Sequence, residues 1–137
     1  MLTAFESAGI DILWHPSLSE LSGKDVVKLF ERIIAGEVRL DILCLEGAVM
    51  TGPNGTGKFH MMAASGKPMQ SWIGDLARMA KHVVAVGSCA AFGGITSAGG
   101  NATEARGLSY DGERRGGFLG RDFRAKGGLP VVNIAGC

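Results

Sequence analysis

The chain has 137 residues, of which 46% are hydrophobic and 20% charged, and its formal net charge is +1. This length fits one domain, or part of a larger one, with a substantial buried core. A nearly neutral charge excludes the basic surface of a nucleic-acid-binding protein, and no apolar run is long enough for a transmembrane helix. The three cysteines include no Cys-x-x-Cys pair, which excludes a secreted disulfide scaffold. Glycine is unusually frequent: its 22 residues are roughly twice the ~7% average.

The first part of the chain predicts a strand, a helix and a second strand. Residues 9–15 have the apolar content of a short strand that ends before a proline. Apolar residues at helical spacing predict a helix over residues 22–36, with a glycine at its C-terminal end. Residues 40–45 have the composition of a strand that is covered on both faces, and this strand ends at Glu46.

The second part continues the alternation. A glycine-rich loop at residues 51–58 precedes a helix over residues 68–79, whose first residue is a proline. Residues 82–86 and 129–134 have the composition of two further buried strands. Strands that alternate with helices indicate an α/β fold with a doubly wound parallel sheet.

A long excursion separates the last two strands. Residues 93–128 contain 11 of the 22 glycines together with several arginines. A stretch this long without periodic structure is usually functional or disordered. The simplest interpretation is a solvated surface loop.

Candidate chemistry lies at the carboxyl ends of the strands, where open parallel sheets bind their ligands. Glu46, Cys89 and Cys137 each follow or end an expected strand beside a glycine, which lets the backbone approach a bulky inorganic group. Iron–sulfur clusters prefer thiolate ligands and normally need four, so two cysteines at two strand ends are half of such a site. Free cysteines also fill cores, which is our interpretation of Cys44 and the alternative for Cys89 and Cys137.

A rival signal is the stretch Gly52–Lys58, which follows a strand and matches the G-x-x-x-x-G-K pattern of a phosphate-binding loop. Phe59 replaces the Ser or Thr that would coordinate magnesium, and a glycine at position 66 interrupts the helix that should cradle phosphate. No later strand ends in an acidic residue for the metal. We therefore interpret this stretch as a turn-rich surface loop, with a nucleotide-binding module as the alternative.

Taken together, the strand ends resemble the small subunit of nickel–iron hydrogenases. The resemblance rests on Leu45–Gly47, Val86–Gly94 and Val132–Cys137, whose order and spacing fit the N-terminal, flavodoxin-like domain of that family. Three further stretches look closest to its hydrogen-sensing and high-affinity uptake branches: Trp14–Ser17, Gly52–Gly57 and Gly94–Thr96.

The resemblance implies a flavodoxin-like doubly wound sheet and a proximal 4Fe–4S cluster that faces the nickel–iron centre of a large partner subunit. Cys89 and Cys137 match the third and fourth cysteine ligands of this cluster, and Glu46 matches the family's acidic residue near it. The implied role is electron relay during hydrogen oxidation or sensing, because hydrogen is split at the partner's metals. The resemblance does not identify the redox acceptor.

Members of this family also have a first strand ending in Cys-x-x-Cys, which supplies two cluster ligands, and they continue past the last Gly-Cys motif. We therefore expect residues 1–137 to be a partial flavodoxin-like iron–sulfur domain that lacks its first strand and is inactive alone. The absence of a twin-arginine signal predicts a cytoplasmic location. A second family with similar cysteine turns, the corresponding subunit of respiratory complex I, is a further alternative.

Overall fold

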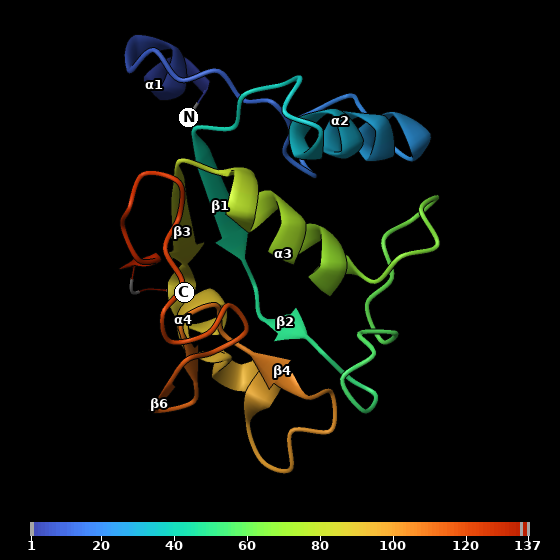
Figure 1. The fold of residues 1–137 in the computed structure, drawn as a ribbon, viewed down its shortest axis with the longest axis vertical. Coiled ribbons are helices and arrows are strands. Elements are labelled where there is room, and N and C mark those ends of the chain that lie inside the picture. The colour runs from blue at the N-terminus through green and yellow to red at the C-terminus, as the bar shows by residue number, and fades with distance from the viewer. Residues whose placement is uncertain (1, 135, 137) are drawn as a thin grey trace.

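The computed structural model describes residues 2–134 and 136. At its centre lies a three-stranded parallel sheet in the order β1 (Ile42–Glu46), β3 (His82–Val86) and β7 (Val132–Ile134). The register aligns Glu46 with Val86, and Val86 with Ile134. The carboxyl ends of all three strands therefore meet at one edge of the sheet (Figure 1).

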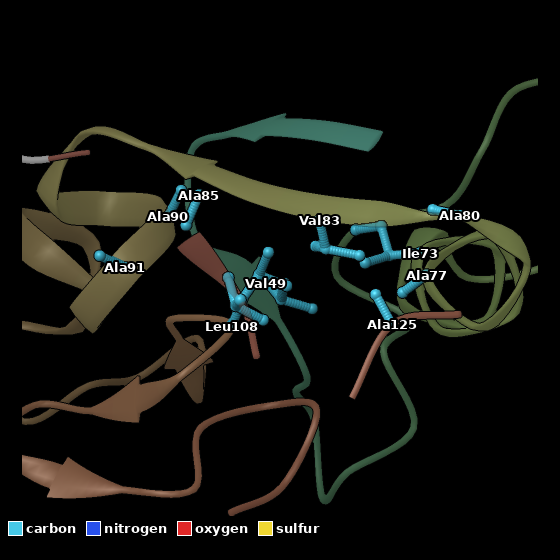
Figure 2. Packing of buried hydrophobic residues seen from close by; sticks show 11 residues of the cluster. Val49, Ile73, Ala77, Ala80, Val83, Ala85, Ala90, Ala91, Leu108 and Ala125 are labelled. Carbon is cyan, nitrogen blue, oxygen red and sulfur yellow. The ribbon is translucent and has the colours of Figure 1, made fainter. Parts of the chain in front are cut away.

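Two amphipathic helices form the core with the sheet. Helix α3 (Met69–Met79) places Ile73 and Ala77 against Val83 of β3, as Figure 2 shows. Helix α2 (Lys24–Ile34) packs on α3, where the rings of Phe30 and Trp72 lie 5.9 Å apart. Both helices end close to the predicted positions, because their apolar residues recur at the spacing that keeps one face buried.

The prediction of a strand over residues 9–15 is wrong. Helix α1 (Leu2–Ser7) precedes this segment, which itself forms no strand and leaves Ile10 and Leu13 largely exposed. In the flavodoxin-like strand order 2-1-3-4-5, the second strand pairs only with the first. Without such a neighbour in the described part of the chain, the segment has no sheet to join.

The expectation that residues 40–45 are covered on both faces is also wrong. Burial alternates along β1: Leu43 and Leu45 pack against the core, whereas Ile42 and Cys44 point to the opposite, open face. Ile42 keeps 47% of its surface exposed, and Cys44 is exposed as well. The interpretation of Cys44 as a core residue is therefore incorrect, because α2 and α3 cover only one face of the strand.

The third predicted strand, residues 82–86, has its expected bounds, and a short helix follows it. Gly87 and the two residues after it do not prolong β3 but open a short helix, α4 (Gly87–Phe92), which turns back at Gly93. The left-handed φ of +95° at Gly93 is a conformation that glycine adopts without steric cost. Cys89 therefore sits in a helix at the edge of the sheet.

The excursion over residues 93–128 is more structured than a solvated loop. It contains the 3₁₀ helix η1 (Gly94–Ser97) and three short strands, β4 (Ala105–Arg106), β5 (Tyr110–Asp111) and β6 (Arg114–Arg115). Strand β4 pairs antiparallel with β2 (Val49–Met50), and β5 pairs with β6. Leu108 is fully buried beside Val49 (Figure 2) and closes the core below the sheet edge.

None of the helices in the described residues has the length and apolar character needed to cross a membrane.

Candidate functional site at the carboxyl edge of the sheet

The site forms where β1 and β3 end side by side. Glu46, the last residue of β1, pairs in register with Val86, the last residue of β3. Helix α4 begins at the next residue and lies at the end of β3 (Figure 1). Its residue Cys89 is therefore at the same edge of the sheet as Glu46. The structure thus brings to one edge two of the three side chains that the sequence predicted for the site.

The turns that follow β3 and β7 meet at this edge. The backbone nitrogen of Ser88 donates a hydrogen bond to the carbonyl oxygen of Gly136, with a distance of 2.9 Å. A Cβ on Gly87 would lie 3.2 Å from the same oxygen, which is tighter than an ordinary contact. The absence of a side chain at Gly87 therefore allows the two segments to approach this closely. Cys137, the third predicted site residue, follows Gly136 in the chain and lies outside the described residues.

The thiol of Cys89 is unpaired, partly exposed and bordered by a glycine. A Cβ on Gly94 would lie only 2.6 Å from the Cys89 Sγ atom. The φ of Gly94 is +54°, which also disfavours any other residue there. Gly94 therefore keeps free the space beside the thiol that a side chain would fill.

Residues of the excursion fix the helix that carries Cys89. Leu108 donates its backbone N–H to the carbonyl oxygen of Ala90 at 2.7 Å, and Gly112 donates to that of Phe92 at 3.0 Å. A Cβ on Gly107 would lie 2.2 Å from the Ala91 oxygen, so only glycine fits against α4 at this position. This support was not predicted from the sequence, although the glycine content of the excursion was a signal of close backbone contacts.

The metal-binding capacity of the described residues is limited. Glu46 is exposed, and its carboxylate makes no hydrogen bond or ion pair with the described residues. Cys89 is the described thiol at this edge. Within residues 2–134 and 136, no group of three or more His, Cys, Asp or Glu side chains lies close enough to hold a metal ion. Cys89, with the space that Gly94 leaves, fits one thiolate position of a cluster and does not form a complete site.

Cys44 has a different environment from Cys89. It lies on the open face of β1, where it pairs in register with Val84 of β3. Cys44 is exposed as a residue, but neighbouring residues partly cover its thiol, and this desolvation raises the pKa of the thiol above its ordinary value of 9.0. Desolvation disfavours the thiolate, so a smaller fraction of Cys44 than of an ordinary cysteine is ionised at neutral pH.

The glycine-rich loop Gly52–Lys58 already holds a negatively charged group. The backbone N–H groups of Asn54 and Gly55 donate to the two carboxylate oxygens of Glu104, at 2.7 and 2.9 Å. In a phosphate-binding loop such N–H groups cradle phosphate. Helix α3 begins only at Met69. This geometry favours the surface-loop interpretation over a nucleotide site.

Comparison with known proteins gives consistent matches. Residues 1–137 match the family model described as NADH ubiquinone oxidoreductase, 20 Kd subunit. The chain is 35% identical over 103 residues to the F420 non-reducing hydrogenase I small subunit of Methanosarcina mazei. This alignment covers 70% of this chain and 25% of the relative. The chain is also 35% identical over 129 residues to the periplasmic NiFe hydrogenase small subunit 1 of Nitratidesulfovibrio vulgaris, covering 93% and 35% of the two chains.

Among solved structures, the actinobacterial-type NiFe-hydrogenase from Ralstonia eutropha superposes with a TM-score of 0.71 at 30% identity, over 90% of this chain and 35% of that chain. The parallel α/β architecture predicted from the sequence is thereby confirmed. The chain spans 25% to 35% of the length of these relatives.

Proposed function

The chain belongs to the NADH ubiquinone oxidoreductase 20 Kd subunit family. Because its relatives include small subunits of hydrogenases, we propose that it is part of the electron-transfer small subunit of a nickel–iron hydrogenase. The observation that carries the proposal is the hydrogen bond from Ser88 to Gly136. It draws together the two turns whose next residues are Cys89 and Cys137. The sheet edge thus gathers the parts of the chain that carry the two predicted thiolates.

Cys89 and Cys137 are the residues that would hold a 4Fe–4S cluster, with Cys89 placed where Gly94 leaves space beside its thiol. When bound, such a cluster supplies reversible one-electron transfer. A cluster normally has four thiolate ligands. The remaining two therefore come from sequence outside residues 1–137, which fits a chain that spans only part of its relatives.

Other groups at the edge would tune the cluster. The hydroxyl of Ser88 and the backbone N–H of Cys89, at the start of α4, are candidate donors for hydrogen bonds to sulfur, which raise a cluster's potential. The exposed carboxylate of Glu46 acts in the opposite direction, because a negative charge disfavours an additional electron. The residues of this chain thus set the redox environment and do not take part in hydrogen cleavage.

A partner surface is the second element of the proposal. Ile95, directly after the glycine that borders Cys89, has 84% of its surface exposed, and Phe92 at the end of α4 has 38%. Val86 and Ile134, the last residues of β3 and β7, are exposed at the same edge. Exposed apolar side chains gathered at one site are typical of a protein interface. We assign this edge to contact with the large hydrogenase subunit.

The finer role follows from the resemblance of Trp14–Ser17 and Gly52–Gly57 to the hydrogen-sensing and high-affinity uptake branches. In either branch, Cys89 would hold the cluster at the edge that we assign to the partner subunit, and the bound cluster would receive electrons from that side. The proposed direction of transfer is therefore from the large subunit to this chain and onward to an acceptor.

The test compares two cysteine substitutions in the complete small subunit, purified with its large subunit. Cys89→Ser removes the proposed ligand, whereas Cys44→Ser alters a thiol outside the site and serves as the matched control. We expect Cys89→Ser to lose the electron paramagnetic resonance signal of the proximal cluster together with hydrogen-dependent dye reduction, and Cys44→Ser to retain both. A Cys89→Ser protein with unchanged signal and activity would refute the ligand assignment.

A further inference from the structure

Glu104 reaches across the fold to the glycine-rich loop. Its Oε1 atom accepts a hydrogen bond from the backbone nitrogen of Asn54 at 2.7 Å, and its Oε2 atom accepts one from Gly55 at 2.9 Å. Two successive N–H groups that converge on one anion form a backbone nest. Charge-assisted bonds of this kind are stronger than bonds between neutral groups.

The rest of the loop is fixed around the same residue. The backbone oxygen of Glu104 accepts hydrogen bonds from both the amide and the hydroxyl of Thr51, at 3.2 and 2.7 Å. The side-chain amide of Gln70 donates to the carbonyl oxygen of Gly55 at 2.9 Å. Glu104 therefore contacts both the start and the tip of the loop, with its side chain and its backbone.

This contact also connects the loop to the helix that bears Cys89. Glu104 immediately precedes β4, which pairs with β2 at the start of the loop. A few residues further on, Leu108 bonds to Ala90 of α4. Backbone hydrogen bonds thus join the loop to the residues just before β4, and the residues just after β4 to α4.

We propose that Glu104 is a positioning residue whose carboxylate is the built-in anion of this nest. It locks residues 51–57 onto the segment 101–108 that supports α4. The resemblance of the loop to a phosphate-binding loop then has a physical explanation: the loop binds an oxyanion, and that oxyanion belongs to the chain itself. Removal of the carboxylate leaves an empty nest that a small carboxylate from solution can fill. This inference does not depend on a cluster or a partner.

The test is amide hydrogen exchange, measured by nuclear magnetic resonance on the 137-residue chain. Glu104→Ala is compared with Glu113→Ala, which removes the same charge from an exposed glutamate that makes no hydrogen bond or ion pair with the described residues. We expect the Asn54 and Gly55 amides to exchange about tenfold faster in Glu104→Ala, as for the loss of a charge-assisted bond, and to be unchanged in Glu113→Ala. Concentrated sodium acetate should restore their protection in Glu104→Ala, whereas sodium chloride at equal ionic strength should not.

Two results would overturn the proposal: unchanged exchange of both amides in Glu104→Ala, or the same response to acetate and chloride. If Glu104→Ala does not fold, the exchange of the same two amides in Glu104→Gln tests the proposal instead. Its single acceptor oxygen satisfies one of the two N–H groups, so one of the two amides should exchange faster while the other stays protected. Full protection of both amides in Glu104→Gln would contradict a role for the charged carboxylate.

Discussion

The amide of Ser88 donates to the carbonyl oxygen of Gly136 across 2.9 Å, and this hydrogen bond joins the segments that follow β3 and β7. Parallel strands in register bring their carboxyl ends together, but they do not by themselves bring the following turns into contact. The glycine at position 87 allows this close approach, with a φ of +85°. The backbone conformations of Gly87 and Gly136 therefore bring the two parts of the site together, and side-chain packing contributes less.

Gly94→Ala should distort the site. The new Cβ would lie 2.6 Å from the Cys89 sulfur in a left-handed backbone conformation. We expect a loss of about 2 to 3 kcal/mol in unfolding free energy, from overpacking and backbone strain together, and a changed rate of reaction of Cys89 with a thiol reagent. Denaturant titration and kinetic thiol labelling measure the two effects.

Gly99→Ala is the matched control for this change. Its φ of +64° imposes similar strain, but a Cβ there meets nothing within 4 Å. It should cost about 1 kcal/mol and leave the labelling rate of Cys89 unchanged. Equal effects of the two substitutions on both measurements would show that the contact with Cys89 is unimportant.

Gly107→Ala tests the support beneath α4. A Cβ at this position would meet the Ala91 oxygen at 2.2 Å, and its three nearest neighbours are all backbone atoms of Ala91 and Phe92, which cannot rotate aside as a side chain could. We expect a loss of about 3 kcal/mol or more, measured by urea denaturation. Gly100→Ala, where a Cβ meets nothing within 4 Å, should be neutral or slightly stabilising. Comparable stability of the two variants would contradict the observed packing.

Cys44 should make the protein sensitive to alkali. Burial raises the pKa of its thiol above 9.0, so at high pH the unfolded chain releases this proton before the folded chain does. The contribution is fully present below the unfolded value and is lost as pH rises through the folded value. As the pH rises from neutral to above 9.0, the free energy of unfolding should therefore fall less in Cys44→Ala than in the wild type. Denaturant midpoints of both proteins at each pH measure this difference. Parallel pH profiles of the two proteins would disprove this linkage.

The isolated 137-residue chain should not hold a stable 4Fe–4S cluster. Its two candidate ligands supply half of the thiolates that such a cluster normally needs. Anaerobic reconstitution with iron and sulfide, followed by desalting and metal analysis, should leave substoichiometric iron. Stoichiometric iron and sulfide with a cluster-type paramagnetic spectrum would mean that ligands other than Cys89 and Cys137 complete the site.

Local patterns predicted the elements that hold the site. Strand β3 has the predicted bounds, His82–Val86, because a continuous apolar run lies between clear turn residues. The segment over residues 9–15 has a similar composition, yet it forms no strand without a pairing partner. Composition thus indicates which segments can form strands, whereas the hydrogen-bonding neighbours determine which of them do.

Contacts between distant residues could not be predicted in this way. Glu104 binds Asn54 across 50 positions of the chain, and no local pattern marks it as a partner of the loop. Leu108 is likewise fully buried although it lies in a stretch rich in glycine and arginine. By contrast, the position of Cys89 at the carboxyl edge of the sheet could be predicted, because it depends only on where the preceding strand ends.

The most direct test of the central claim is the DNA sequence on both sides of this reading frame. The claim requires two more thiolates in the same subunit as Cys89 and Cys137. It predicts an in-frame upstream segment that encodes a strand ending in Cys-x-x-Cys, and a coding sequence that continues downstream. Stop codons directly on both sides would contradict it and would leave the Cys89 edge without the ligands that a cluster needs.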